Sequence, residues 1–206
     1  MYQDFVIKLQ DHLLTRLLGK EYDGDEQEYM PAERNGVTIQ DNRLHFHRTL
    51  RINYTSYDLR RQQDIINPTS KPDVMVLSCK DGEDVHPFWY AHVVKIFHVF
   101  ICHCGSAPQT EHTPTEPQRM DVLWVHWFRL DADAWGGWSK KQLHGISFIP
   151  WDEPGALGFL DPAQVIRGVH LIPNFPQGRT ESRLPPSIAR PKDDGDEDWE
   201  GFYVNL

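Results

Sequence analysis

The chain of 206 residues has no long hydrophobic run and only three cysteines. No apolar stretch approaches the roughly 18 residues that a membrane-spanning helix requires. The first residues lack a basic segment followed by an apolar one, so no secretory signal is expected. Cys102 and Cys104 are separated by one residue, and three cysteines do not form a disulfide framework. These absences predict an intracellular protein, nuclear or cytoplasmic, without a membrane segment.

Catalytic motifs are also missing. The sequence contains no P-loop, no glycine-rich dinucleotide-binding turn and no nucleophile elbow. A two-metal nuclease needs separated carboxylates that converge on Mg²⁺, for which Asp73, Asp121 and Asp161 are the candidates. Asp121, however, begins a strand-like run, and Asp161 precedes Pro162 in a turn or helix cap. We therefore expect no enzymatic activity and no cofactor.

The acidic residues are concentrated at the two ends of the chain, whose formal net charge is −9. Residues 1–33 hold eight acidic and three basic side chains, and residues 193–206 hold six acidic and no basic ones. The body between them carries a net charge of +2. An acidic chain is not expected to bind a phosphate backbone tightly by itself, whereas a basic protein partner would suit it. Solvated acidic runs without a partner are the plainer alternative.

Aromatic residues make up 12% of the chain and gather in two apolar runs, His86–Phe97 and Met120–Phe128. Aromatic and β-branched composition, bounded by turn formers, predicts a strand for each run. We expect the second strand to be buried on both sides, as in a small closed barrel. Its two faces are both apolar, with Met120, Val122, Trp124 and Phe128 on one and Leu123, Val125 and Trp127 on the other.

The rest of the chain is predicted to form one helix followed by short strands. Apolar residues one turn apart predict a helix over Asp4–Leu18, capped by Asp4 and ended by Gly19. Its apolar stripe (Phe5, Leu9, Leu13 and Leu17) must rest either on the following domain or on part of a longer protein. Further strands are expected at 37–40, 44–46, 50–57, 73–78, 143–150, 165–172 and 202–206.

These elements predict a mainly β fold, an SH3-like barrel with long loops and one N-terminal helix. The expected organisation is the helix (1–20), an acidic linker (21–36) and a β-rich domain (37–206). That domain includes a proline-rich, acidic excursion over residues 173–200.

Cysteine and histidine residues near position 100 form a candidate metal site. Cys102 and Cys104 lie close to His98 and His112, and His45 and His47 could add two ligands from one strand face. Zinc sites usually use cysteine pairs two to four residues apart together with a second pair, and this spacing does not match. Surface or hydrogen-bonded histidines are the plainer interpretation, so no metal is expected.

Four aromatic residues are candidates for a binding site: Tyr90, Trp127, Trp135 and Trp138. Exposed indole and phenol faces attract quaternary ammonium groups, as in methyl-lysine readers, so these residues are predicted to form an aromatic cage. The alternative is that they pack beneath a loop and serve only the core.

A basic cluster offers the competing function. Five basic residues would form a face for nucleic acid, namely Arg48, Arg51, Arg60, Arg61 and Lys71. Binding of this kind depends steeply on salt concentration. An ordinary solvated strand and loop edge is the alternative.

Several segments resemble a region near the C-terminal end of Plavaka-type transposases, a CACTA-like group of DNA transposons in mushroom-forming fungi. The segments are Lys8–Leu14, Arg51–Arg61, Asn67–Leu77, His86–Ala91, Gly158–Pro173 and Pro186–Arg190. The resemblance implies that a nuclease core lies upstream and that the N-terminal helix is the tail of that domain. It also implies that the family region continues past Leu206, which makes independent transposase activity unexpected.

A looser resemblance is to bromo-adjacent homology domains, which are β-rich chromatin modules. It rests on the order of three strand-like segments, Trp89–Phe97, Val122–Phe128 and Ile166–Leu171. The leading hypothesis is accordingly a non-enzymatic, transposase-derived accessory module, a folded monomer that binds a protein partner, with chromatin or a histone tail as the expected partner. A nucleic-acid-binding or metal-dependent DNA-processing fragment is the alternative.

Overall fold

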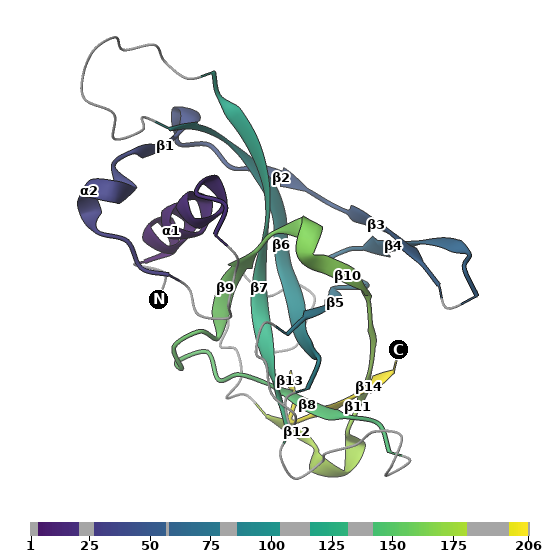
Figure 1. Cartoon of the computed structure of the whole chain (residues 1–206). Coiled ribbons are helices and arrows are strands. Elements are labelled where there is room, and N and C mark those ends of the chain that lie inside the picture. The colour runs from purple at the N-terminus through teal and green to yellow at the C-terminus, as the bar shows by residue number, and fades with distance from the viewer. Residues whose placement is uncertain are drawn as a thin grey trace, which may run out of the picture.

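The computed structural model describes residues 4–20, 27–56, 58–78, 86–103, 116–131, 142–180 and 198–205. Two α-helices and fourteen strands are assigned within these ranges (Figure 1). The helices are α1 (Phe5–Leu17) and α2 (Pro31–Arg34). The strands are β1 (Val37–Ile39), β2 (His45–His47), β3 (Leu50–Thr55), β4 (Arg61–Ile66), β5 (Asp73–Leu77), β6 (Phe88–His103), β7 (Gln118–Leu130), β8 (Gly145–Phe148), β9 (Leu157–Leu160), β10 (Val165–Gly168), β11 (His170–Pro173), β12 (Arg179–Thr180), β13 (Asp198–Trp199) and β14 (Phe202–Asn205).

Two long antiparallel strands, β6 and β7, form the centre of the main sheet. On its side away from β7, strand β6 pairs with β5, β2 and β1 along its length. On its side away from β6, strand β7 pairs with β9 and β8. The strand order is β10-β5-β6-β7-β8-β14-β11. Because β6 and β7 are longer than their neighbours, each edge holds several short strands along its length (Figure 1).

The two-sided burial predicted for β7 is confirmed. Met120, Val122 and Trp124 belong to a core cluster beneath α1. Leu123, Val125 and Trp127 lie on the opposite face, in a second cluster with residues of β5 and β6. All of these side chains are at most 7% exposed. The aromatic and β-branched composition of the run thus reflects packing on both faces of the sheet.

Helix α1 covers one face of β6, β7 and β9 (Figure 1). Leu9, Leu13 and Leu14 are buried against the sheet, and the Phe5 ring packs edge-on against Trp124 with ring centroids 5.3 Å apart. Gly19 ends the helix in the left-handed conformation at φ 64°, as predicted, whereas the Asp4 side chain makes no capping bond. The apolar stripe therefore needs no upstream domain to cover it, and the domain boundaries themselves stay predictions.

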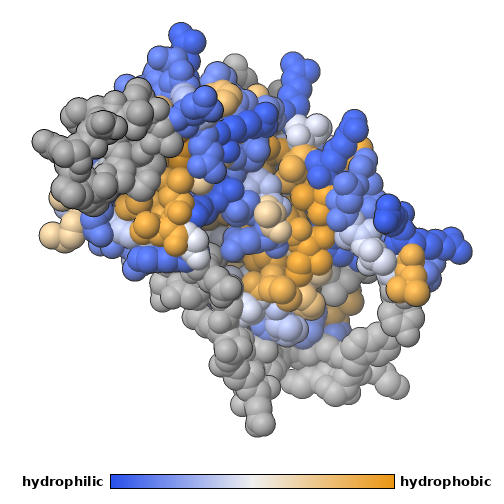
Figure 2. Space-filling view, turned by 45° about the horizontal axis from the view of Figure 1, so that its top comes forward, coloured by the Kyte–Doolittle hydropathy of each residue, from blue (hydrophilic) through white to orange (hydrophobic). Residues whose placement is uncertain are grey.

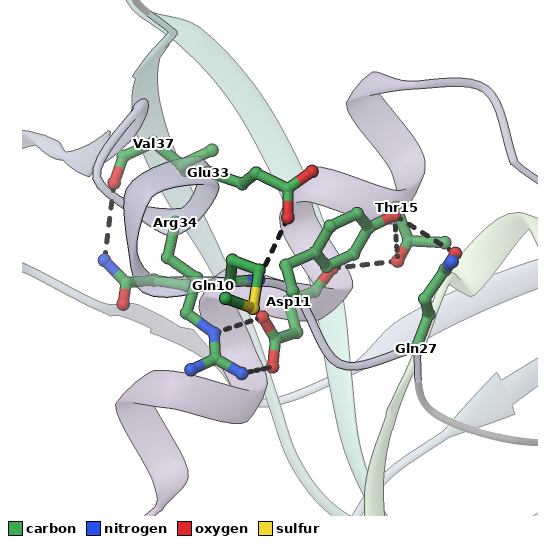
Figure 3. Close-up of polar contacts among 9 residues, drawn as sticks. Gln10, Asp11, Thr15, Gln27, Glu33, Arg34 and Val37 are labelled. Carbon is green, nitrogen blue, oxygen red and sulfur yellow. Dashed lines mark hydrogen bonds and ion pairs between the residues drawn. The ribbon is translucent and has the colours of Figure 1, made fainter.

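Polar contacts fasten α1 to the segment that follows it (Figure 3). Arg34 donates from Nε and Nη2 to the two carboxylate oxygens of Asp11, at 2.5 and 2.7 Å. Asp11 is only 5% exposed, so this bidentate pair compensates a charge that is otherwise costly to bury. Gln10 Nε2 donates to the Val37 carbonyl at 3.3 Å, which links the helix to β1.

The mainly β architecture with one N-terminal helix is confirmed. Strands β10 and β11 lie at the two ends of the strand order and are joined by a single residue, Val169. Among the described residues the hydrogen-bonded ladder is an open path, so the expected closed barrel is not observed. Within the same ranges neither helix has the length and apolar character needed to cross a bilayer.

Two well-formed strands were not expected from the sequence. Residues 61–66 were not among the strands expected from the sequence, but they form β4 in register with β3. Residues 157–160 were not among the expected strands either, but they form β9 on the edge of β7. Both strands are short, and their pairing depends on a partner strand far more than on their own composition.

Candidate functional site

Strands β3 and β4 form a two-stranded hairpin that projects from the main sheet (Figure 1). Six residue pairs are in register, from Leu50 opposite Ile66 to Thr55 opposite Arg61. At about 3.4 Å per residue, each strand spans roughly 20 Å. Because side chains alternate along a strand, the hairpin presents two different faces.

The inner face anchors the hairpin on the main sheet. Ile52 and Ile66 are buried in the second core cluster, at 8% and 1% exposure. Asp64 accepts a hydrogen bond at 3.0 Å from the backbone N–H of Gly168 in β10. The Arg167 guanidinium lies 5.0 Å from the centre of the Tyr54 ring, in cation–π geometry. These contacts hold the base of the hairpin in a fixed orientation.

The outer face of the hairpin is exposed and carries no carboxylate. Cross-strand pairs place arginine beside isoleucine, asparagine beside glutamine, and threonine beside arginine. Gln63 Nε2 donates to Asn53 Oδ1 at 2.8 Å, so the two amides form a rung at the middle of the face. In Figure 2 hydrophilic residues cover much of the surface on the side where the hairpin extends. The outer face consists of Arg51, Asn53, Thr55, Arg61, Gln63 and Ile65.

Charge around the hairpin is locally positive although the chain is acidic. Residues 43–71 hold six basic and two acidic side chains. Both acids are engaged: Asp58 pairs with Arg60 at 2.9 Å, and Asp64 accepts from Gly168. Neither Arg51 nor Arg61 forms an ion pair with a residue of the described ranges. Both guanidinium groups are therefore available to an anionic ligand.

The structure brings the predicted basic residues together along this hairpin. Arg48 precedes β3, Arg51 lies within it, and Arg60 and Arg61 follow the turn at the tip. Lys71 lies just after β4 and is held by a bridge to Asn67. All five side chains are exposed. An open hollow of about 490 Å³ lies at the half of the hairpin nearer the tip. It is lined by residues of both faces, namely Asn53, Tyr54, Thr55, Arg61, Gln62 and Gln63.

The predicted aromatic cage is not assembled by its described members. Tyr90 is 2% exposed and lies in a cluster with Phe128 and Phe148. Trp127 is 7% exposed and lies in the second cluster, where its ring packs edge-on against Trp89. Burial also raises the pKa of the Tyr90 hydroxyl to about 12. Neither ring offers a face to a ligand, because both fill the core. The other two candidates, Trp135 and Trp138, lie outside the described residues.

The candidate metal residues have mixed outcomes. Cys104 and His112 lie outside the described residues, and Cys102 is a half-buried free cysteine on β6. His98 contacts His47 of β2, with 2.7 Å between His47 Nε2 and His98 Nδ1. Desolvation lowers the pKa of His98, and the nearby charges of Arg119, His45 and His47 lower it further. Two histidines of the neighbouring strand β2, His45 and His47, stack against His98.

The three aspartates considered for a two-metal nuclease have different partners. Asp73 accepts from His92 Nδ1 at 2.9 Å, and Asp161 pairs with Arg16 at 2.9 Å. Asp121 pairs with Arg119 at 2.7 Å. They do not form a shared carboxylate site.

Comparison of the chain with known proteins found no relative. No family model, curated protein or solved structure matches it.

Proposed function

We propose that the chain binds duplex nucleic acid through the outer face of the β3–β4 hairpin. The observation that carries the proposal is the composition of that face. Two arginines that form no ion pair within the described part of the chain lie with two amides and a threonine on one exposed face that carries no carboxylate. These side chains are the ones that hydrogen-bond to base edges and phosphates.

The dimensions of the hairpin suit the major groove of B-form DNA. That groove is about 12 Å wide and admits a two-stranded β-ribbon. Arginine forms bidentate bonds to guanine, and asparagine or glutamine forms them to adenine. Arg51 and Arg61 occupy opposite ends of the outer face, with the rung formed by Asn53 and Gln63 between them. The face thus offers a row of donors that follows the groove.

Basic residues flanking the ribbon supply contacts to the phosphate backbone. Arg48, Arg60 and Lys71 are exposed at the base and the tip of the hairpin. Phosphate contacts position a protein on the duplex without reading sequence. The overall charge of −9 limits non-specific attraction, so binding should depend on this local surface and weaken at moderate salt.

The test is a fluorescence-anisotropy titration with duplex DNA at low and moderate salt. We expect salt-sensitive binding by the full chain. The Arg51→Ala/Arg61→Ala variant should bind roughly tenfold to a hundredfold more weakly. Lys71→Ala should lower the slope of log affinity against log salt by about 0.9 if it loses one phosphate contact. Arg43→Ala is the matched control, because Arg43 is exposed but precedes β2 and lies outside the hairpin.

Equal loss of affinity in the Arg43→Ala and Arg51→Ala/Arg61→Ala variants would contradict the proposal, because it would show a general charge effect. Unchanged affinity in the double variant would contradict it as well. Circular dichroism serves to check that each variant is folded. Because the substituted positions are exposed, we expect only small effects on stability.

A protein partner is the second candidate function, and the tip of the hairpin favours it. Leu59 is 86% exposed and has a left-handed backbone at φ 62°. That conformation is unfavourable for a leucine, and an exposed apolar tip is available as an anchor for a partner. A histone-peptide array, run beside the DNA titration, tests this candidate. Selective peptide binding that is lost in Leu59→Asn, with little DNA affinity, would replace the nucleic-acid proposal.

We also propose that the chain derives from a DNA transposase and that its sheet closes into a barrel. A region derived from a DNA transposase would act on DNA or on chromatin, and both arms of the experiment cover these partners. The hydrogen-bonded ladder is open among the described residues, so the barrel of a bromo-adjacent homology module stays a proposal, favoured only by the short link through Val169 between its two end strands, β10 and β11. A solved structure of the full chain would test the closure.

A further inference from the structure

Three neighbouring strands place a histidine-rich cluster on the sheet face opposite α1. His98 of β6 lies opposite His45 of β2 and, on its other side, opposite Asp121 of β7. His47 follows on the same face of β2, two residues after His45. On the reverse face of β6 and β7, the neighbouring Phe97 and Val122 pack beneath α1. The cluster is therefore fixed by the register of the sheet.

The potential ligand atoms converge. One side-chain donor atom each from His47, His98 and Asp121 lies within 4.8 Å of the other two. His47 Nε2 and His98 Nδ1 are 2.7 Å apart. The His98 ring stacks with His45 and with His47, at centroid distances of 4.7 and 4.9 Å. His47 and Asp121 are exposed and His98 is half-buried, so a hydrated ion can reach the cluster from the side of His47 and Asp121.

We propose that His47, His98 and Asp121 form a binding site for a divalent transition metal, with Zn²⁺ as the best match. Two imidazoles and one carboxylate are a common donor set for zinc, with a fourth position left for water. Two ligands of one tetrahedral zinc lie about 3.3 Å apart, so the two histidine nitrogens, now 2.7 Å apart, need to separate by about 0.6 Å.

Arg119 competes with the metal for Asp121. Its guanidinium pairs with the carboxylate at 2.7 Å, and both side chains are about half exposed, at 51% and 49%. Ion pairs this exposed are weak, so a metal ion can displace the guanidinium. The variant Arg119→Gln removes the competing charge and should tighten metal binding several-fold.

The bound metal would join β2 to the two central strands. Strand β3 begins at Leu50, three residues after His47, so the site lies where the chain enters the hairpin. The inference is independent of nucleic-acid binding, because none of its ligands belongs to the outer face of the hairpin.

The test uses the full chain, stripped of metal with a chelator and titrated with ZnSO₄ by calorimetry. One equivalent of Zn²⁺ should bind, and Co²⁺ should give the visible absorption of a tetrahedral nitrogen and oxygen site. His47→Ala, His98→Ala and Asp121→Asn should each weaken binding at least tenfold. If His98→Ala fails to fold, His47→Ala still tests the metal site, because His47 is exposed and its loss should not affect folding.

Two control variants separate this site from other ligands in the chain. The first is Cys102→Ser/Cys104→Ser, which removes the thiols. The second is His170→Ala, which removes an exposed histidine on β11. Both should keep full affinity. The proposal is overturned if no Zn²⁺ binds, if binding survives in His47→Ala and Asp121→Asn, or if the cysteine variant loses it.

Discussion

The β3–β4 hairpin and the central β6–β7 ladder are both antiparallel strand pairs, but they use their side chains in opposite ways. In the ladder, both faces of β7 are buried, and residues such as Trp124 and Trp127 fill the core. In the hairpin, only the inner face is packed, and the outer face presents arginines and amides to solvent.

This difference shows which sequence signal marks the binding surface. Tyr90 and Trp127 were predicted to belong to an aromatic cage. In the ladder, however, they stabilise the fold by burying large apolar surfaces. Residues 61–65 are mostly polar and were not among the expected strands, yet they form one strand of an exposed ribbon. Substitutions in the ladder should therefore alter the free energy of unfolding, and substitutions on the outer face should alter binding.

The largest expected effect is on the ladder side. Trp127→Ala removes a ring that is 7% exposed and packs against Trp89, so it should lower the free energy of unfolding by about 3–5 kcal/mol. Chemical denaturation followed by circular dichroism measures the change. The folded fraction should bind DNA as the parent chain does.

Trp151→Ala is the matched control for this substitution. Trp151 is 39% exposed, so its removal should cost much less stability. A Trp127→Ala variant of normal stability that loses peptide binding would instead restore the aromatic-cage interpretation and break the distinction between ladder and hairpin.

An intermediate effect comes from the helix that covers the ladder. Burial, with a smaller contribution from Arg16, lowers the pKa of His12 to about 3. The buried Nε2 of His12 has no hydrogen-bond partner among the described residues. The unfolded chain binds a proton near pH 6.5 and the folded chain does not, so stability should fall as the pH drops below 6.5.

Denaturation midpoints at pH 7.5 and pH 5 measure this loss. His12 should contribute a decrease of about 2 kcal/mol between the two pH values. The variant His12→Gln cannot titrate, so its stability should decline less over the same range. Parallel pH profiles for the parent chain and the variant would show that His12 is accessible to protons in the folded state.

The contrast between the two regions also explains what could be predicted from the sequence. Helix α1 and the two central strands were predictable, because their apolar periodicities report directly on buried faces. Strand β4 was not, because three polar residues at its start, Arg61, Gln62 and Gln63, find their structure only by pairing with β3. The sequence identified the basic residues of the hairpin individually. That Arg51 and Arg61 share its outer face follows only from the register of β3 and β4.

The histidine cluster was even less accessible to sequence analysis. His47, His98 and Asp121 are far apart in the chain and meet only through the order β2-β6-β7 and its register. A shift of one residue in either pairing would turn a ligand to the opposite face. The repeated histidines at 45 and 47 were the available signal, but nothing in the sequence indicates that β7 supplies a carboxylate beside them.

The smallest expected effect concerns the joint between the two regions, at Gly168. A Cβ there would lie 3.0 Å from Cδ1 of Ile66 and 3.5 Å from Oδ2 of Asp64, so Gly168→Ala should push the hairpin away from β10. The overpacking outweighs the gain from a stiffer unfolded chain, so the free energy of unfolding should fall by about 1 kcal/mol.

Ile66→Val removes the Cδ1 atom that the new methyl group meets, and it supplies the matched control. In a double-mutant cycle, Gly168→Ala should cost less in the Ile66→Val background than alone. Additive losses would show that hairpin and sheet do not meet at this contact, and the fixed orientation inferred for the binding face would then need another anchor.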